Sequence, residues 1–114
     1  MNETTKNAIE LAAYAAGVNA NHASKMAASA KEYAEADQPW TAQNNLDDAE
    51  KYQAIAEAYA TVAGDEATKL QTLGTKNILR AAQEAVAAAK ERYLEKQKTE
   101  AIQDLLKEIT KNMG

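Results

Sequence analysis

Small apolar residues recur along the first third of the chain at a strict helical spacing. Successive positions are separated by alternating steps of four and three residues, which places them on one face of an α-helix. They are Ile9, Ala13, Ala16, Ala20, Ala23, Ala27, Ala30 and Ala34. The stripe keeps its phase through Gly17. The pattern predicts one helix over about residues 4–37, with a break at Gly17 as the alternative.

Two further segments carry the same kind of pattern. In the second, the apolar positions are Leu46, Ala49, Tyr52, Ala56, Tyr59, Ala63, Ala67, Leu70 and Leu73. Their phase passes through Gly64, so one helix over about residues 41–73 is favoured, and a kink or a stop at Gly64-Asp65 is the alternative. The third segment predicts a helix over about 75–112. Its stripe is Ile78, Leu79, Ala82, Ala85, Val86, Ala89, Tyr93 and Leu94, followed after a polar gap by Ile102, Leu105, Leu106, Ile109 and Met113.

The boundaries between these helices coincide with helix-breaking residues. Pro39 disfavours helical geometry in the residue before it, which predicts a turn near residues 38–40. Gly74 has the position of a glycine just past a helix end, and Thr75 follows it as a possible N-cap. The sequence therefore predicts a single all-α domain over residues 1–114, folded as an antiparallel up-down-up bundle of three long helices.

This threading predicts which large side chains meet at each end of the bundle. One end is expected to gather Tyr33, Met26, Trp40, Leu46, Leu105, Leu106 and Ile109. The other end is expected to gather Ile9, Leu11, Leu70, Leu73, Ile78 and Leu79. Between them the bundle is expected to be filled mainly by alanine, which lets helices approach closely.

The composition limits how much stability such a core supplies. The 114 residues include 27 Ala but only 8 Leu, 5 Ile and 3 Val, and there is no Phe. Buried alanine removes little apolar area from water, at roughly 25 cal/mol per Å². Burial against a partner subunit would add to this, so the composition favours self-association.

Charge and cysteine content exclude several classes of function. A net charge of −4 argues against sequence-independent nucleic-acid binding, which requires a basic surface. The absence of Cys excludes disulfides and thiolate metal sites. We expect no membrane span, because no apolar run approaches 18 residues, and no secretory signal, because the start lacks a basic segment. A cytoplasmic protein, or a part of a particle assembled inside cells, is expected.

The residues with potential chemistry are few. His22 and Met26 lie one turn apart, but two ligands do not complete a metal site. Asp47, Asp48 and Glu50 form an acidic patch early in a helix, where negative charge complements the helix dipole. No phosphate-binding loop or nucleophile motif is present. We therefore expect neither an enzyme nor a metal or other cofactor.

Two features are candidate contacts with a protein partner. Trp40 beside Pro39 is expected to cap the bundle end, with projection toward a partner as the alternative. The amphipathic segment with Ile102, Leu105, Leu106 and Ile109 is expected to complete the bundle, with docking on another protein as the alternative.

These observations favour a non-enzymatic structural or interaction protein that forms a homo-oligomer or joins a larger assembly, such as the virion of a bacterial virus. A small acidic regulator or inhibitor that binds one partner protein is the alternative. An enzyme or ligand carrier with a pocket between the helices is a third, less favoured reading.

Overall fold

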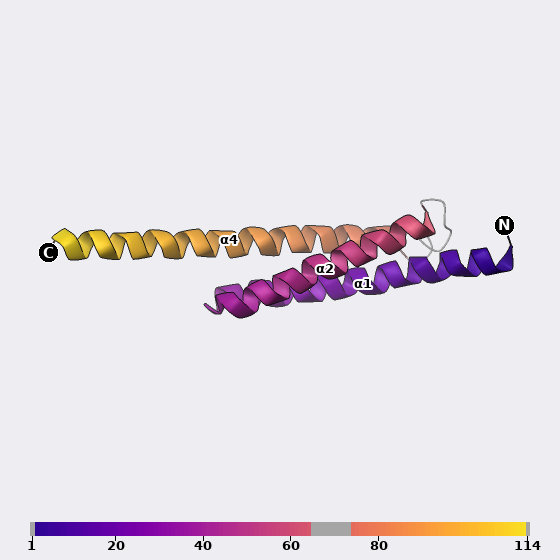
Figure 1. Cartoon of the computed structure of the whole chain (residues 1–114), viewed down its shortest axis with the longest axis horizontal. Coiled ribbons are helices and arrows are strands. Elements are labelled where there is room, and N and C mark those ends of the chain that lie inside the picture. Colours follow the sequence, from indigo (N-terminus) through magenta and orange to yellow (C-terminus); the bar gives the residue numbers. More distant parts are fainter. Residues whose placement is uncertain (1, 65–73, 114) are drawn as a thin grey trace.

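A computed structural model describes residues 2–64 and 74–113 of the chain. It contains three helices, α1 (Glu3–Glu35), α2 (Pro39–Ala63) and α4 (Thr75–Met113), and no strand within the described residues. The helices form an elongated bundle with extents of 78 × 19 × 16 Å (Figure 1). The predicted all-α three-helix bundle is confirmed. Residues 65–73, where the second helix was expected to continue, lie outside the described part.

The helix ends follow from local backbone chemistry. Asn2 caps α1 by accepting a hydrogen bond from the Thr5 amide at 2.7 Å. Asp37 adopts a left-handed φ of 59° just before Pro39, the first residue of α2. Helix α2 ends at Gly64, whose φ of 81° favours glycine. The predicted break at Pro39 is therefore confirmed, α1 runs through Gly17 without a break, and of the two alternatives at Gly64 the structure has the stop.

Contacts between specific residues define the direction of each helix. His22 lies against Tyr52, and Ala63 packs with Ala12 and Ala13, so α2 runs antiparallel to α1. Later residues of α4 meet later residues of α1: Thr75 contacts Ala13, Arg92 contacts Glu35 and Lys96 contacts Asp37. Helices α1 and α4 therefore run parallel. Helix α1 is central, because it packs along both of the others, while α2 and α4 touch less extensively.

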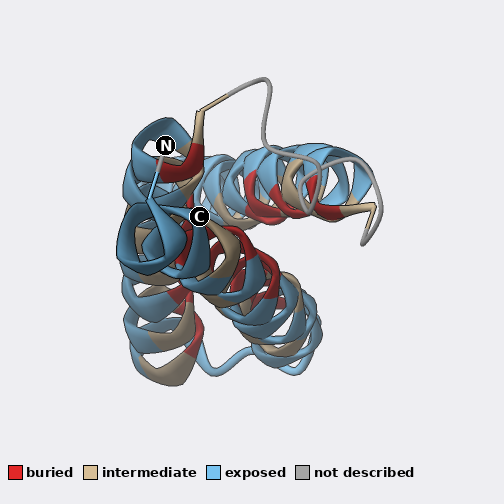
Figure 2. Cartoon of the chain, turned by 90° about the vertical axis from the view of Figure 1, so that its right-hand side faces the viewer, coloured by how far each residue is buried: buried red, intermediate tan, exposed pale blue. Residues whose placement is uncertain are grey.

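The core consists almost entirely of alanine. Among the described residues, every buried hydrophobic side chain is Ala except Leu46 and Val86. The buried residues lie on the sides of the helices that face one another (Figure 2). The predicted alanine stripe of α1 is confirmed from Ala13 to Ala34, and Ile9 is half-buried. Ala82, Val86 and Ala89 provide the matching face of α4.

Charged residues on α4 pair with acidic residues of the other two helices. Lys90 lies 3.7 Å from Glu50 on α2, and Arg92 lies 3.4 Å from Glu35 on α1. The side chains are about half exposed, and exposed pairs of this kind contribute about 0–1 kcal/mol each. These ion pairs join α4 to both neighbouring helices, but they add little stability.

The predicted gathering of large side chains at the bundle ends is wrong in most respects. Helix α4 begins beside Ala13 and Gly17, near the middle of α1, and not at its N-terminus. Because α4 has 39 residues, it extends far past the end of α1 (Figure 1). Leu105, Leu106 and Ile109 are consequently exposed instead of packing near Leu46. At the other end Leu11 is 68% exposed, while Leu70 and Leu73 lie outside the described residues.

Candidate interaction surface

Helix α4 leaves the bundle at the turn between α1 and α2. Its last contact with the other helices is the ion pair of Lys96 Nζ with Asp37 Oδ1, at 3.0 Å. The following residues, 97–113, are the overhang, and they continue as helix past the ends of α1 and α2 (Figure 1). Every residue from 101 to 113 is exposed. The expectation that this segment completes the bundle is therefore wrong.

The overhang carries an apolar face that no described part of the chain covers. Large apolar side chains follow one another at steps of three, one, three and four residues, so they share one side of the helix. We define the C-terminal stripe as these five, which are between 54% and 82% exposed: Ile102, Leu105, Leu106, Ile109 and Met113. Contiguous exposed apolar surface of this kind is typical of interaction sites. Four of the five were candidate partner contacts in the sequence.

The charged residues of the overhang stabilise its helix very little. Three pairs of like charge are four residues apart, and each disfavours the helix by a few tenths of a kcal/mol. These pairs are Glu100–Asp104, Asp104–Glu108 and Lys107–Lys111. Two opposite-charge pairs three residues apart, Asp104–Lys107 and Glu108–Lys111, offset them in part. Isolated helices of about this length are marginal in water, so burial of the C-terminal stripe would be the main source of stability.

Trp40, the fifth candidate contact, lies in the first turn of α2, at the end of the bundle from which α4 continues. Its side chain is 78% exposed. The expectation that it caps the bundle is therefore wrong, because the buried residue of this region is Ala42. The indole is free to contact a partner at the root of the overhang.

The residues weighed for chemistry have ordinary structural roles. The His22 ring packs edge-on against Tyr52, with centroids 4.1 Å apart. Asp47 accepts a hydrogen bond from Gln43, and Glu50 pairs with Lys90. Within residues 2–64 and 74–113, no three His, Asp or Glu side chains are grouped closely enough to hold a metal ion. Thr75, expected to cap its own helix, instead donates to the Ala13 carbonyl of α1.

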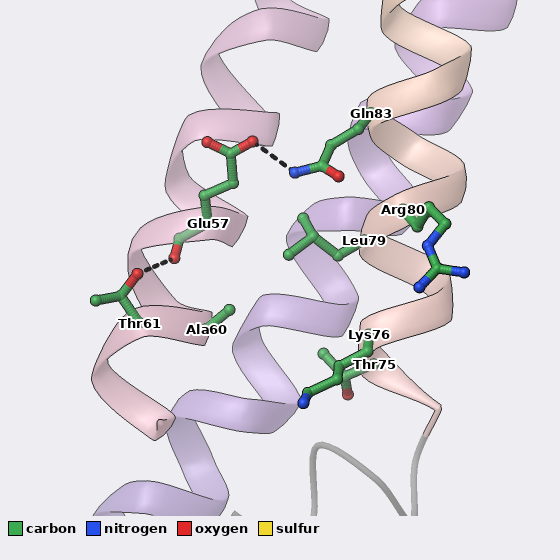
Figure 3. A pocket seen from close by; sticks show the side chains of 8 residues that line it. All are labelled: Glu57, Ala60, Thr61, Thr75, Lys76, Leu79, Arg80 and Gln83. Carbon is green, nitrogen blue, oxygen red and sulfur yellow. Dashed lines mark hydrogen bonds between the residues drawn. The ribbon is translucent and has the colours of Figure 1, made fainter. Parts of the chain in front are cut away.

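A shallow groove separates α2 from α4 above the surface of α1 (Figure 3). It has a volume of about 390 Å³ and opens to solvent. Glu57 and Gln83 reach across it, with Gln83 Nε2 donating to Glu57 Oε1 at 2.9 Å. Gln53, at 3.0 Å, and Gln83 lower the pKa of Glu57, opposed by partial burial. The carboxylate therefore stays ionised near neutral pH, which does not suit a general acid.

A second apolar surface was not recognised in the sequence. Leu11 and Val18 lie off the alanine face of α1, and both are at least half exposed. The signal that could have revealed it is charge, because residues 11–24 include no Asp, Glu, Lys or Arg. An exposed helix face normally carries charge, so an uncharged face indicates a site where water is excluded.

In comparisons with known proteins, no family model, curated protein sequence or solved structure matches the chain. No helix in the described part of the chain is long and apolar enough to cross a membrane. The interaction surface therefore has to be interpreted from its own chemistry.

Proposed function

We propose that this protein is a non-enzymatic helical protein that self-associates through the C-terminal stripe of α4. The observation that supports this most is the position of the stripe. Five large apolar side chains lie on an overhang that the alanine core does not reach, while the core contains only two larger aliphatic residues among the described positions. The five large apolar side chains at the C-terminal end of α4 are thus placed where a second molecule can bury them.

The energetics require an apolar surface on the other side of the contact. Full burial of one such side chain contributes about 1.5–3 kcal/mol, so covering the exposed part of five contributes roughly 5–8 kcal/mol. Association itself costs about 4–15 kcal/mol. The stripe alone therefore supports only weak binding to a polar surface. A second apolar surface in the same contact would make the complex stable.

The molar mass in solution tests this proposal. Because the molecule is 78 Å long, elution volume would overestimate its size, and the mass should come from light scattering or sedimentation equilibrium. We expect a mass above that of one chain, rising with concentration. The double variant Leu105→Gln/Leu106→Gln should return the mass to one chain while the helical circular dichroism is kept.

A matched control changes the opposite side of the same helix. Lys107→Gln/Lys111→Gln removes two exposed charges outside the C-terminal stripe and should leave association intact. A wild-type protein that stays a single chain at all concentrations would overturn the proposal. An unchanged mass for the double leucine variant would overturn it as well.

The alternative of an acidic regulator has less support. Such a regulator could bind through the acidic residues of the second helix, but two of these have partners within the chain, since Asp47 accepts from Gln43 and Glu50 pairs with Lys90. The same mass measurement separates the two functions, because a regulator with one foreign partner remains a single chain when purified.

A further inference from the structure

The outer side of the α1–α2 pair carries the second exposed apolar surface. We define the hairpin patch as five residues of these two helices that are between 41% and 69% exposed: Leu11, Tyr14, Val18, Tyr59 and Val62. It contains two tyrosines, which are favoured anchors in protein interfaces. No other described helix covers these side chains.

Two contacts between α1 and α2 place the halves of this patch side by side. His22 meets Tyr52 at one level, and Ala12 and Ala13 meet Ala63 at the other. Val18 precedes His22 by about one turn, and Tyr59 follows Tyr52 by about two turns. Both residues therefore lie between the two contact levels, on the side marked by the His22 and Tyr52 rings.

Helix α4 occupies the opposite side of the pair. It contacts α2 through Gln83 and Glu57, and Glu57 is two residues from Tyr59, on the other side of that helix. Among residues 52–63, Glu57 is the single charged residue. Covering the hairpin patch therefore removes no charge from water, and this avoids the main cost of burying a surface.

The C-terminal stripe is wide enough to pack against two neighbouring helices at once, and wider than packing on a single helix requires. Leu105 and Leu106 are consecutive, so the stripe spans about 100° of the helix circumference. A stripe this wide is typical of a helix that packs into a globular core, whereas a two-stranded coiled coil has a narrower seam. The seam between α1 and α2 supplies two neighbouring helices.

The two surfaces are equal in number, and the hairpin patch is the shorter of the two. Ile102 to Met113 covers about 17 Å of helix, and the α1 part of the patch, Leu11 to Val18, covers about 11 Å. Each chain has one of each surface, so a contact between unlike surfaces covers both of them throughout an assembly. If two overhangs paired with each other instead, every hairpin patch would stay exposed to solvent. Large exposed apolar patches are rare on protein surfaces.

We infer that the C-terminal stripe of one chain docks on the hairpin patch of a second copy, adding its overhang to the α1–α2 pair as a further packed helix. This inference rests on the proposed self-association and names the surface that receives the stripe. The contact joins two different surfaces. Two chains can therefore form a closed dimer in which the overhang of each packs on the hairpin patch of the other, or further copies can add head to tail.

Mixing of two defective variants tests the inference. Val18→Lys places a charge in the hairpin patch, and Leu106→Lys places one in the C-terminal stripe. We expect each variant alone to have the mass of one chain with unchanged helical circular dichroism. Their mixture should form a one-to-one complex, because one chain retains an intact overhang and the other an intact patch. Ala28→Lys and Gln103→Lys, exposed positions on the same helices, should leave association unchanged.

Cross-linking identifies the contact directly, because the chain contains no Cys. Val18→Cys and Leu106→Cys chains of different length, mixed and mildly oxidised, should give mainly the mixed disulfide. Dominance of the 106–106 product, with Val18→Lys still associating, would overturn the inference and leave self-association standing. A wild-type mass of one chain would instead overturn the proposed function, and the inference with it.

Discussion

Thr75, the first residue of α4, packs against Gly17 in the middle of α1. Its hydroxyl donates to the Ala13 carbonyl at 3.4 Å, and a Cβ placed on Gly17 would lie 3.6 Å from the same oxygen. Thr75 is 1% exposed. This contact fixes where α4 begins along α1, and hence how far its other end extends beyond the bundle.

The space at Gly17 predicts that Gly17→Ala stabilises the protein. The new methyl group would make an ordinary van der Waals contact with Thr75, and alanine in a helix is favoured over glycine by about 0.5–1 kcal/mol. Urea denaturation should show this gain. Gly64→Ala is the contrast: its φ of 81° strains any other residue, and we expect a loss of about 1–3 kcal/mol. A destabilising Gly17→Ala would mean that the helices are closer than described.

The alanine core predicts sensitivity to added volume. Ala20 is fully buried, so Ala20→Leu must separate the helices and should destabilise by about 1–3 kcal/mol. Ala28→Leu adds the same atoms at an exposed position of the same helix and should change stability by less than about 0.5 kcal/mol. Equal thermal shifts for the two variants would contradict the buried position of Ala20.

The separation of core and overhang predicts different effects for two leucines. Leu46 is 3% exposed, and Leu46→Ala should lower the free energy of unfolding by about 2–5 kcal/mol. Leu105 is 59% exposed, and Leu105→Ala should change it by less than about 0.5 kcal/mol. Denaturation should be followed at a concentration where the mass is that of one chain. A large loss for Leu105→Ala in those conditions would indicate that the overhang folds back on its own bundle.

The hydrogen bonds of Glu57 predict a small dependence of stability on pH. Gln53, then Gln83, lower its pKa in the folded state. The stabilisation is complete above the pKa of the unfolded chain and is lost as the pH falls through the folded-state pKa. Glu57→Gln should therefore lose less stability on acidification than the wild type. The difference should be less than about 1 kcal/mol, because Glu57 is only partly buried and solvent screens its carboxylate. Parallel stability curves in a pH series would contradict it.

The positions of the helices and of their buried faces were largely predictable. The alanines from Ala13 to Ala34 are buried because a constant four-three spacing specifies one helix face whatever lies against it. Pro39 begins α2 because its fixed φ suits the first helical position, and Gly64 follows the last residue of α2 because glycine tolerates a positive φ. The same spacing could not show whether α2 continues past Gly64, because periodicity does not report the φ of a glycine.

The candidate surface was only half predictable. The residues of the C-terminal stripe stood out by their spacing, but spacing does not distinguish a face that completes its own bundle from one that is left uncovered. In the same way, the sequence around Trp40 does not indicate that its side chain is exposed. The sequence pattern does not show that Leu11 and Val18 are exposed either, since an apolar residue beside a core stripe usually packs against a neighbouring helix.

The sequence by itself determined the three helical segments, the break at Pro39 and the alanine faces, because these depend on interactions between residues close in the chain. The tertiary structure alone decided the register of α4. A seam of nearly identical alanines offers similar packing at several offsets, so the choice depends on particular contacts such as those of Thr75 with Ala13 and Gly17. That offset separates the C-terminal stripe from the core and leaves it for a second molecule to bury.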